Sequence, residues 1–278
     1  TNLANMEVDL ISDVNSNGLA DAGESITAVA ISDAGGKYTF AGITPGYYVI
    51  REVNPFGYYS TGDSQGRTDG QISFVSTNGI VSTTNNFYSR LLPVAVNDLG
   101  ATVYATPVII YPLTNDLSPN GDGLSLAAVA TSDGMAVINP GNTNLTFTPT
   151  NTGLTTIRYT LADAHGGLAT GLVRVVVSPA PLTVSANNAI RKYGQVNPGF
   201  SGAITGLVNG DDITATYATI ATTNSPAGLY PIVPTLVDPN GRLANYAVTN
   251  LNGTLTVDKV LLGITANSTH RLYGAAYP

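Results

Sequence analysis

Twelve residues near the start of the chain, Asp13 to Glu24, combine acids, amides and a glycine at a regular spacing. Counted from Asp13, oxygen-bearing side chains occupy positions 1, 3, 5, 9 and 12, and a glycine occupies position 6. Ca²⁺ takes about six to eight oxygen ligands, and glycine permits the sharp bend that brings them together. The spacing predicts a calcium-binding loop, with an Asn-Gly hairpin turn and solvated acids as the alternative. The predicted ligands are Asp13, Asn15, Asn17, the backbone carbonyl of Leu19, Asp21 and Glu24.

Strand-like segments flank this loop on both sides. Residues 7–12 read EVDLIS and residues 25–32 read SITAVAIS, and both are rich in β-branched residues. Such segments favour strands over helices. We therefore expect the loop to join two strands, and we do not expect the helix-loop-helix arrangement of an EF-hand.

One further segment matches a catalytic pattern. Residues 62–66 read Gly-Asp-Ser-Gln-Gly, which fits the Gly-x-Ser-x-Gly turn of serine hydrolases. That turn needs a strand before it, a helix after it, and a later acid and histidine. Here the following residues indicate a turn and a strand, and His165 and His270 stand in a glycine turn and in a repeated segment. We therefore expect no enzyme and assign no catalytic residue.

The composition excludes several classes of partner and site. The 11 Lys and Arg residues face 18 Asp and Glu residues, which gives a net charge of −7. Nucleic-acid binding needs a basic patch, so no nucleic-acid partner is expected. The absence of cysteine excludes disulfides and thiolate metal sites, and it fits a bacterial surface protein. No apolar run approaches the ~20 residues of a membrane-spanning helix, so we expect no membrane span in this segment.

The same composition predicts an all-β fold. Thr, Val, Ile and Tyr are frequent, and 30 Gly and 16 Pro separate short alternating segments. A length of 278 residues allows two or three domains. We place the domain boundaries near residues 92 and 179, the second at a Ser-Pro-Ala-Pro linker over residues 178–181.

One segment of the chain is repeated at an offset of 80 residues. Residues 182–198 read LTVSANNAIRKYGQVNP and residues 262–278 read LGITANSTHRLYGAAYP, and 7 of these 17 positions are identical. A fixed period of domain size marks a tandem array. Residues 260–278 are therefore predicted to be the start of a further, truncated repeat. One hypothesis is that an adjacent copy completes it by strand pairing, and the alternative is a tail that trails from the third domain.

Residues 1–92 resemble the B-type repeats of bacterial surface adhesins, the SdrD- and CnaB-like sandwiches. The resemblance implies a β-sandwich stapled by calcium. It also implies a second calcium region at Asp63 and Asp69, for which a solvated loop is the alternative. The residues that carry it, besides the loop at Asp13, are Gly36, Tyr38, Phe40, Pro45-Gly46, Tyr48, Glu52, Pro55 and Gly57-Tyr58.

Some members of that adhesin family carry a Lys–Asn isopeptide bond assisted by an acid. In this chain Glu52 stands where the acid would be, and Asn85 or Asn86 is the matching acceptor. The first strand offers Asp9 and Leu10 but no lysine. We therefore do not expect the bond.

Residues 93–178 resemble the cadherin-like Ig-fold repeats of bacteria. Turn residues recur about every ten residues between short alternating strands, as in a β-sandwich. Four acids are candidates for calcium near a domain junction or, equally, for turn caps through Asx hydrogen bonds. These acids are Asp98, Asp116, Asp122 and Asp163. The resemblance rests on Asn97-Asp98, Thr106-Pro107-Val108, Asn115-Asp116, Gly121-Asp122, Phe147-Thr148-Pro149, Tyr159-Thr160, Asp163 and Gly166-Gly167.

Residues 179–259 resemble the MBG repeats of large bacterial surface proteins. The matching segments are Tyr193-Gly194, Asn197-Pro198, GLVNGDD, AGLYPI, ANYAV and NGTLTV. The resemblance implies a β domain that serves as scaffold. We expect Tyr193, Tyr230 and Tyr246 to be buried or edge-packed rings, with a sugar-binding platform as the alternative.

Together these features predict a tandem array of Ig-like and CnaB-like β-sandwich domains in an extended chain. The expected function is that of a non-enzymatic stalk or fibre segment of an extracellular or cell-surface bacterial protein, rigidified by calcium. An adhesive module that binds a glycan or a protein ligand directly is the alternative. The expected partners are further repeats or neighbouring copies of the same protein, with a surface glycan or protein ligand under the alternative.

Overall fold

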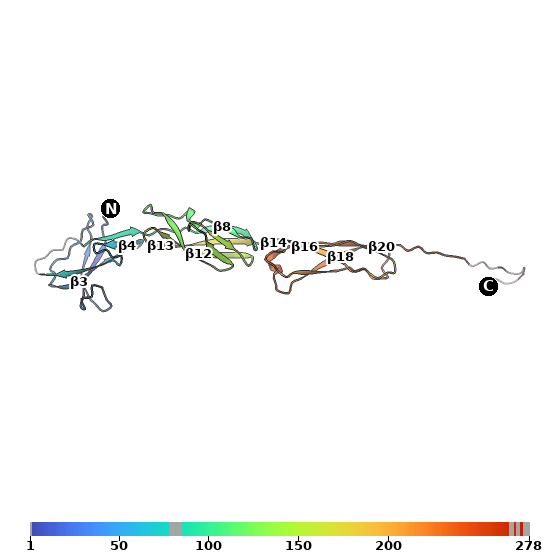
Figure 1. Cartoon of the computed structure of the whole chain (residues 1–278), viewed down its shortest axis with the longest axis horizontal. Helices are drawn as coiled ribbons and strands as arrows, with labels where there is room; N and C mark the ends of the chain where they lie inside the picture. Colours follow the sequence, from blue (N-terminus) through green and yellow to red (C-terminus); the bar gives the residue numbers. More distant parts are fainter. Residues whose placement is uncertain (1, 78–84, 267–269, 271–272, 275–278) are drawn as a thin grey trace. The chain divides into compact units, whose positions relative to one another are not determined.

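The computed structural model describes residues 2–77, 85–266, 270 and 273–274. Figure 1 shows the whole chain, coloured along its sequence. The chain divides into two compact units. The first unit comprises Thr1–Thr102 and Thr106–Val177, and the second comprises Val103–Ala105 and Ser178–Pro278. The short segment Val103–Ala105 therefore belongs to the second unit although it precedes much of the first in sequence.

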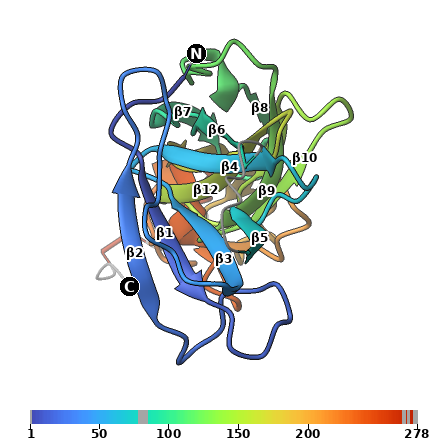
Figure 2. The same cartoon turned by 90° about the vertical axis from the view of Figure 1, so that its left-hand side faces the viewer.

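Two antiparallel sheets form the N-terminal part of the first unit. One has the strand order β2-β1-β3-β5, and its four strands lie side by side in Figure 2. The other pairs β4 with β6. Alternate residues of the larger sheet point inward, and their apolar side chains form a core at Val8, Leu10, Tyr48, Ile50 and Ile72. The strands are β1 (Glu7–Ser12), β2 (Ile26–Ile31), β3 (Gly46–Val53), β4 (Tyr58–Asp63), β5 (Gln71–Ser76) and β6 (Phe87–Leu91).

The rest of the first unit is a second pair of sheets. Their orders are β10-β11-β8 and β7-β13-β12-β9. The long strands β12 and β13 pair antiparallel along their length, and alternate residues such as Ile157, Tyr159 and Leu161 are fully buried. The elements are β7 (Asp98–Val103), β8 (Val108–Ile110), a 3₁₀ turn η1 (Pro112–Thr114), β9 (Leu124–Thr131), β10 (Met135–Ile138), β11 (Leu145–Thr148), β12 (Gly153–Asp163) and β13 (Leu168–Ser178).

The second unit also consists of two sheets. Their orders are β16-β14-β19 and β15-β20-β18-β17, with parallel pairing of β14 with β19 and of β15 with β20. Ala221, Ile232, Leu255 and Val257 are buried in its core. The elements are β14 (Ala180–Ala186), β15 (Ala189–Lys192), β16 (Gly202–Thr205), β17 (Thr214–Ala218), β18 (Gly228–Val237), a 3₁₀ turn η2 (Leu243–Asn245), β19 (Tyr246–Leu251) and β20 (Gly253–Asp258).

The prediction of an all-β fold built of β-sandwich domains is confirmed. The described part of the chain contains strands and two short 3₁₀ turns, but no α-helix. Each named sheet lies within one of the segments 1–92, 93–178 and 179–259. The compact units group the first two of these segments together, and the boundaries at 92 and 179 stay predictions. No helix in the described residues is long and apolar enough to cross a membrane.

The segment from Val260 to Ala266 lies outside every strand and exposes Leu261, Leu262 and Ile264. Leu182 and Val184, which match Leu262 and Ile264 in the repeat, are buried in β14. This segment thus carries the same apolar residues that are buried in β14, the corresponding strand of the complete repeat. Much of the rest of 260–278 lies outside the described residues, and both the further repeat and its completion by another copy stay predictions.

Candidate functional site

The predicted calcium loop connects β1 to β2, which are neighbouring antiparallel strands. The expectation of strand flanks is therefore confirmed. Side-chain oxygens of the loop cap its own backbone. Asp13 accepts hydrogen bonds from Asn17 N at 3.1 Å and from Gly18 N at 2.8 Å. Gly18 has a φ of +75°, the left-handed conformation that glycine adopts without a steric penalty.

Three side chains of the loop converge on one point. The amide nitrogens of Asn15 and Asn17 both donate to Asp21 Oδ2, at 2.8 and 2.7 Å. The oxygens of the same amides accept backbone hydrogen bonds, Asn15 Oδ1 from Asn17 N and Asn17 Oδ1 from Leu19 N. Each amide oxygen has a second lone pair, so it can accept a backbone hydrogen bond and also ligate a cation.

Glu24 closes the loop from its far end. Its two oxygens accept hydrogen bonds from Val14 N and Asp21 N, each at 2.9 Å. The carboxylate thus ties the last position of the loop to its second and ninth residues. The loop is held in a closed shape by its own hydrogen bonds. Such preorganisation lowers the entropy cost of ordering the loop side chains around a ligand.

The donor atoms of the loop suit a hard cation. They are carboxylate, amide and carbonyl oxygens, the ligand types of Ca²⁺. In the part of the chain that the structure describes, no three or more Asp, Glu, His or Cys side chains come together as a metal-holding group. A calcium ion bound here would depend on amide and carbonyl oxygens as well as on carboxylates, and it would have to replace the hydrogen bonds from Asn15 and Asn17 to Asp21.

The second acidic loop, with Asp63 and Asp69, is organised by turn caps. Asp63 is buried, and its Oδ1 accepts hydrogen bonds from Gln65 N at 2.7 Å and Arg67 N at 3.0 Å. Asp69 accepts Gln71 N at 3.0 Å. These bonds are the Asx turns expected of a capped loop.

Asp98 and Asp116 lie beside the buried ring of Tyr159. The Tyr159 hydroxyl donates to the Asp116 carboxylate at 2.9 Å and to the Val96 carbonyl at 2.9 Å. Asp116 also accepts Val96 N at 2.6 Å. Burial, and then the nearby negative charge of Asp116, raise the pKa of Asp98 above its ordinary value. The pair is thus an internal polar network of this sandwich.

Asp122 and Asp163 bind groups from β4, β6 and the turn between β12 and β13, all within the first unit. Asp122 forms an ion pair with Arg90 at 2.7 Å and lies 3.3 Å from His165 Nδ1. Asp163 accepts the Tyr59 hydroxyl at 2.7 Å and caps its own turn at His165 N, 2.9 Å away. Sequence reasoning missed Tyr59 and Arg90, because no motif or spacing in the sequence indicates which distant residues these two side chains contact.

The Gly-x-Ser-x-Gly segment has the wrong elements around it for a nucleophile elbow. Ser64 follows β4 in a turn, and the next element is strand β5, so no helix follows the serine. Its hydroxyl accepts Asn86 N at 3.2 Å. His165 lies beside Asp122, as described above, and not beside this serine in any described contact.

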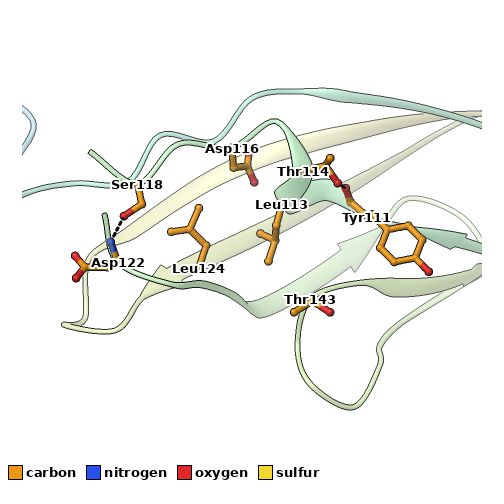
Figure 3. Close-up of a pocket in the computed structure, with 8 residues that line it drawn as sticks. All are labelled: Tyr111, Leu113, Thr114, Asp116, Ser118, Asp122, Leu124 and Thr143. Atoms are coloured by element: carbon orange, nitrogen blue, oxygen red, sulfur yellow. Dashed lines mark hydrogen bonds between the residues drawn. The ribbon is translucent and has the colours of Figure 1, made fainter. Parts of the chain in front are cut away.

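A surface groove of about 460 Å³ lies on the Ig-like half of the first unit (Figure 3). Leu113 and Leu124 occupy its middle, with Tyr111 toward one end and Asp122 toward the other. The Tyr111 side chain is 58% exposed. The groove thus combines an aromatic ring, an apolar floor and a carboxylate. Its lining is Tyr111, Leu113, Thr114, Asp116, Ser118, Asp122, Leu124 and Thr143.

The three tyrosines of the second unit that were expected to be buried or edge-packed, Tyr193, Tyr230 and Tyr246, have different environments. Tyr246 is buried, and its hydroxyl donates to Asp211 Oδ2 at 2.7 Å. Burial, with Asp211 adding to it, raises the pKa of Tyr246 to about 12. Tyr230 packs against the core and donates to the Pro226 carbonyl at 2.8 Å. Tyr193 is 50% exposed, so its expected edge packing is only partial.

Comparison with protein families matches two parts of the chain. Residues 91–176 match the model of a bacterial Ig domain. Residues 182–256 match the model of an MBG domain of the YGX type. These matches bear out two of the three resemblances, and such domains are typical of extracellular or surface proteins and are typically non-catalytic. The likeness of residues 1–92 to SdrD- and CnaB-type repeats has no matching model and stays a prediction.

Comparison with curated proteins found no match. Among solved structures, the chain is similar to a nucleoside hydrolase-related protein from Saccharophagus degradans (19% identity over 31% of this chain and 26% of that one, TM-score 0.26). It is also similar to the human desmocollin-1 ectodomain (9% identity, 92% and 55%, TM-score 0.28) and to an endo-fucoidan hydrolase of glycoside hydrolase family 107 (13%, 85% and 37%, TM-score 0.29). The chain thus spans between about a quarter and about half of the length of these structures.

Proposed function

We propose that this chain is a non-catalytic structural segment of an extracellular bacterial surface protein, rigidified by calcium in its N-terminal domain. The observation that carries the structural role is the series of sheet pairs, each with its own apolar core, in segments that match bacterial Ig and MBG domains. Domains of this kind bear load or space other domains through backbone ladders and packed cores, and such work needs no catalytic group.

The calcium part of the proposal rests on the Asp13–Glu24 loop. Its ligands are Asp13, Asn15, Asn17, the Leu19 carbonyl, Asp21 and Glu24, and four of these side chains already share one hydrogen-bonded network. Extracellular calcium modules bind with Kd values of about 10⁻⁴–10⁻³ M. At millimolar calcium such a site stabilises the folded state, because the ion binds the folded loop and not the unfolded chain.

Calorimetry of the whole chain with and without calcium tests this part. We expect EDTA to lower the melting temperature of the first unit and to leave the second unit unchanged. Glu24→Gln should weaken calcium binding about tenfold or more in titration calorimetry, because it removes a charged ligand that can bind through two oxygens. Glu7→Gln, at an exposed position on β1, is the matched control. Equal melting of both units in EDTA would contradict the proposal.

A second function, direct binding of a surface glycan, is favoured by the groove in Figure 3. An exposed Tyr111 ring beside polar side chains is the kind of surface on which a sugar ring stacks and forms hydrogen bonds. Screening the chain and Tyr111→Ala on an array of neutral and acidic oligosaccharides tests this function. Binding by the parent chain that is lost in the variant supports it, and no binding by either rejects it.

A further inference from the structure

Tyr104 is an integral core residue of the second unit. Its side chain is 0% exposed. Its hydroxyl donates to Asp211 Oδ2 at 2.9 Å and lies 3.3 Å from the donating amide of Asn209. Its ring meets Tyr246 edge-on, with 5.5 Å between ring centroids. Asn209, Asp211 and Tyr246 thus form a tyrosine pocket, a name used below for these three residues.

A fixed backbone frame presents Tyr104 to this pocket. Its N–H donates to the carbonyl of Ser178, the last residue of β13, at 2.9 Å. The next residue, Ala105, has a φ of +57°, which turns the chain away from the strand. The tyrosine is therefore held at the end of β7, beside the point where β13 ends.

The same frame occurs a second time, around Tyr193. The Tyr193 N–H donates to the carbonyl of Asp258, the last residue of β20, at 2.9 Å. The next residue, Gly194, has a φ of +81°. Tyr193 follows the end of β15 as Tyr104 follows the end of β7.

The sheets beside the two tyrosines share one feature of their strand orders. They are β7-β13-β12-β9 and β15-β20-β18-β17, and in each the edge strand that directly precedes the tyrosine lies beside the last strand of its segment. β14 begins at Ala180, two residues after Ser178, and Val260 follows Asp258 by the same two residues. The 80-residue offset aligns Val260 with Ala180. Tyr193 is therefore placed relative to Val260 as Tyr104 is placed relative to Ala180.

Tyr193 has no comparable role inside its own unit. Half of its side chain is exposed, and its hydroxyl bonds to none of the residues that the structure describes. Tyr104, Tyr230 and Tyr246 all use their hydroxyls. Tyr193 is thus held by a defined turn with half of its side chain exposed and its hydroxyl unused among the described residues, so it is available to another domain.

We propose that Tyr193 is the docking residue for the following repeat, and that it enters a tyrosine pocket formed by that repeat's equivalents of Asn209, Asp211 and Tyr246. The proposal rests on the proposed role as a segment of a repeat array. A carboxylate that accepts a tyrosine hydroxyl inside such a pocket gives a specific contact, and it needs no large apolar interface.

A chain with two successive repeats tests the proposal. In it, residues 260–278 are replaced by a second copy of residues 180–259, which keeps the 80-residue period. Tyr193→Ala in this chain should lower the melting temperature of the second copy by about 5 °C or more, read by hydrogen exchange of its own peptides. In the original chain the same substitution should leave the melting temperature unchanged within about 1 °C, because surface truncations cost little.

A double-mutant cycle shows whether the contact is the one proposed. Once the second copy's equivalent of Asp211 is changed to Ala, Tyr193→Ala should cost little more, because contacting residues are not additive. Val196→Ala, at a position 76% exposed on the same turn, is the matched control. If Tyr193→Ala prevents folding of the second copy, Tyr193→Phe keeps the ring and reports on the hydroxyl contact alone.

Two results overturn the inference. One is an equal effect of Tyr193→Ala in the one-repeat and two-repeat chains, and the other is strict additivity with the loss of the pocket carboxylate. Either result, with both copies folded, leaves the structural role in place. A two-repeat chain that shows no cooperative unfolding at all contradicts the proposed function itself, and with it this inference.

Discussion

Glu52 is a carboxyl group placed where its charge is unfavourable. It lies on β3, and its Oε1 accepts the Ser89 hydroxyl at 2.6 Å. Its Oε2 is buried and has no hydrogen-bond partner in the described residues. Burial raises the pKa of Glu52 above its ordinary value, and the hydrogen bond from Ser89 only partly offsets this. The first strand places Val8, not a lysine, opposite Glu52 in the ladder.

Replacing Glu52 by glutamine should make the first unit more stable at neutral pH. Since the folded-state pKa is raised, the stabilisation from protonated Glu52 is fully present below the unfolded pKa and is lost as pH rises through the folded pKa. Glutamine stays neutral throughout. The difference in unfolding free energy between Glu52→Gln and the parent chain should therefore grow between pH 4 and pH 7 and vanish below about pH 4. Denaturant melts across this range measure it, with Glu7→Gln as control, and a difference independent of pH would refute the argument.

At the scale of elements, the turn after β15 is built around a buried arginine. Arg191 donates through Nε to Asn197 Oδ1 at 2.7 Å and through its terminal nitrogens to the carbonyls of Lys192 and Thr222. Asn197 in turn donates to the Ala221 carbonyl at 2.7 Å. One planar side chain thus joins β15, the Tyr-Gly turn and the segment after β17.

Arg191→Lys should destabilise the second unit by about 2–4 kcal/mol. Lysine keeps the charge, but its single nitrogen cannot reach three acceptors in different directions, so buried carbonyls lose their donors. Thermal unfolding followed by hydrogen exchange of the second unit measures the effect. Lys192→Arg, the reverse change at the exposed neighbouring position, is the control. Equal stability of the two variants would show that the guanidinium geometry is not needed.

Sequence patterns predicted some elements well for a physical reason. Alternation of side chains defines a strand and its buried face, so the strands on both sides of the Asp13–Glu24 loop were predictable. Alternation does not say which strand pairs with which. The parallel ladders β14/β19 and β15/β20 therefore had no signal in the sequence. The acids were predicted as turn caps or metal ligands, but their tyrosine and arginine partners lie about 30 to 100 residues away along the chain.

At the scale of the whole molecule, domain boundaries in sequence and compact units in space differ. Linker composition and motif spacing placed boundaries at residues 92 and 179, between segments that each contain whole sheets. Contacts instead group residues 1–102 with 106–177, and they assign Val103–Ala105 to the second unit. No local pattern marks Tyr104 as part of another unit, because its neighbours in sequence are ordinary strand and turn residues. The contact between Tyr104 and the tyrosine pocket could therefore not be predicted from the sequence.

Truncating Tyr104 tests whether this residue stabilises the second unit, to which its contacts assign it, or the segment that surrounds it in the sequence. Tyr104→Ala removes a fully buried ring and leaves Asp211 and Asn209 without one hydrogen-bond partner. Loss of a large buried aromatic costs about 3–5 kcal/mol, so the second unit should lose protection from hydrogen exchange in β19 and β20. The first unit, whose sequence surrounds Tyr104, should keep its protection in β11 and β12. Tyr111→Ala, at an exposed ring in the neighbouring segment, is the matched control. If β11 and β12 open together with β19, or if no strand of the second unit opens, then Tyr104 is not a core residue of that unit.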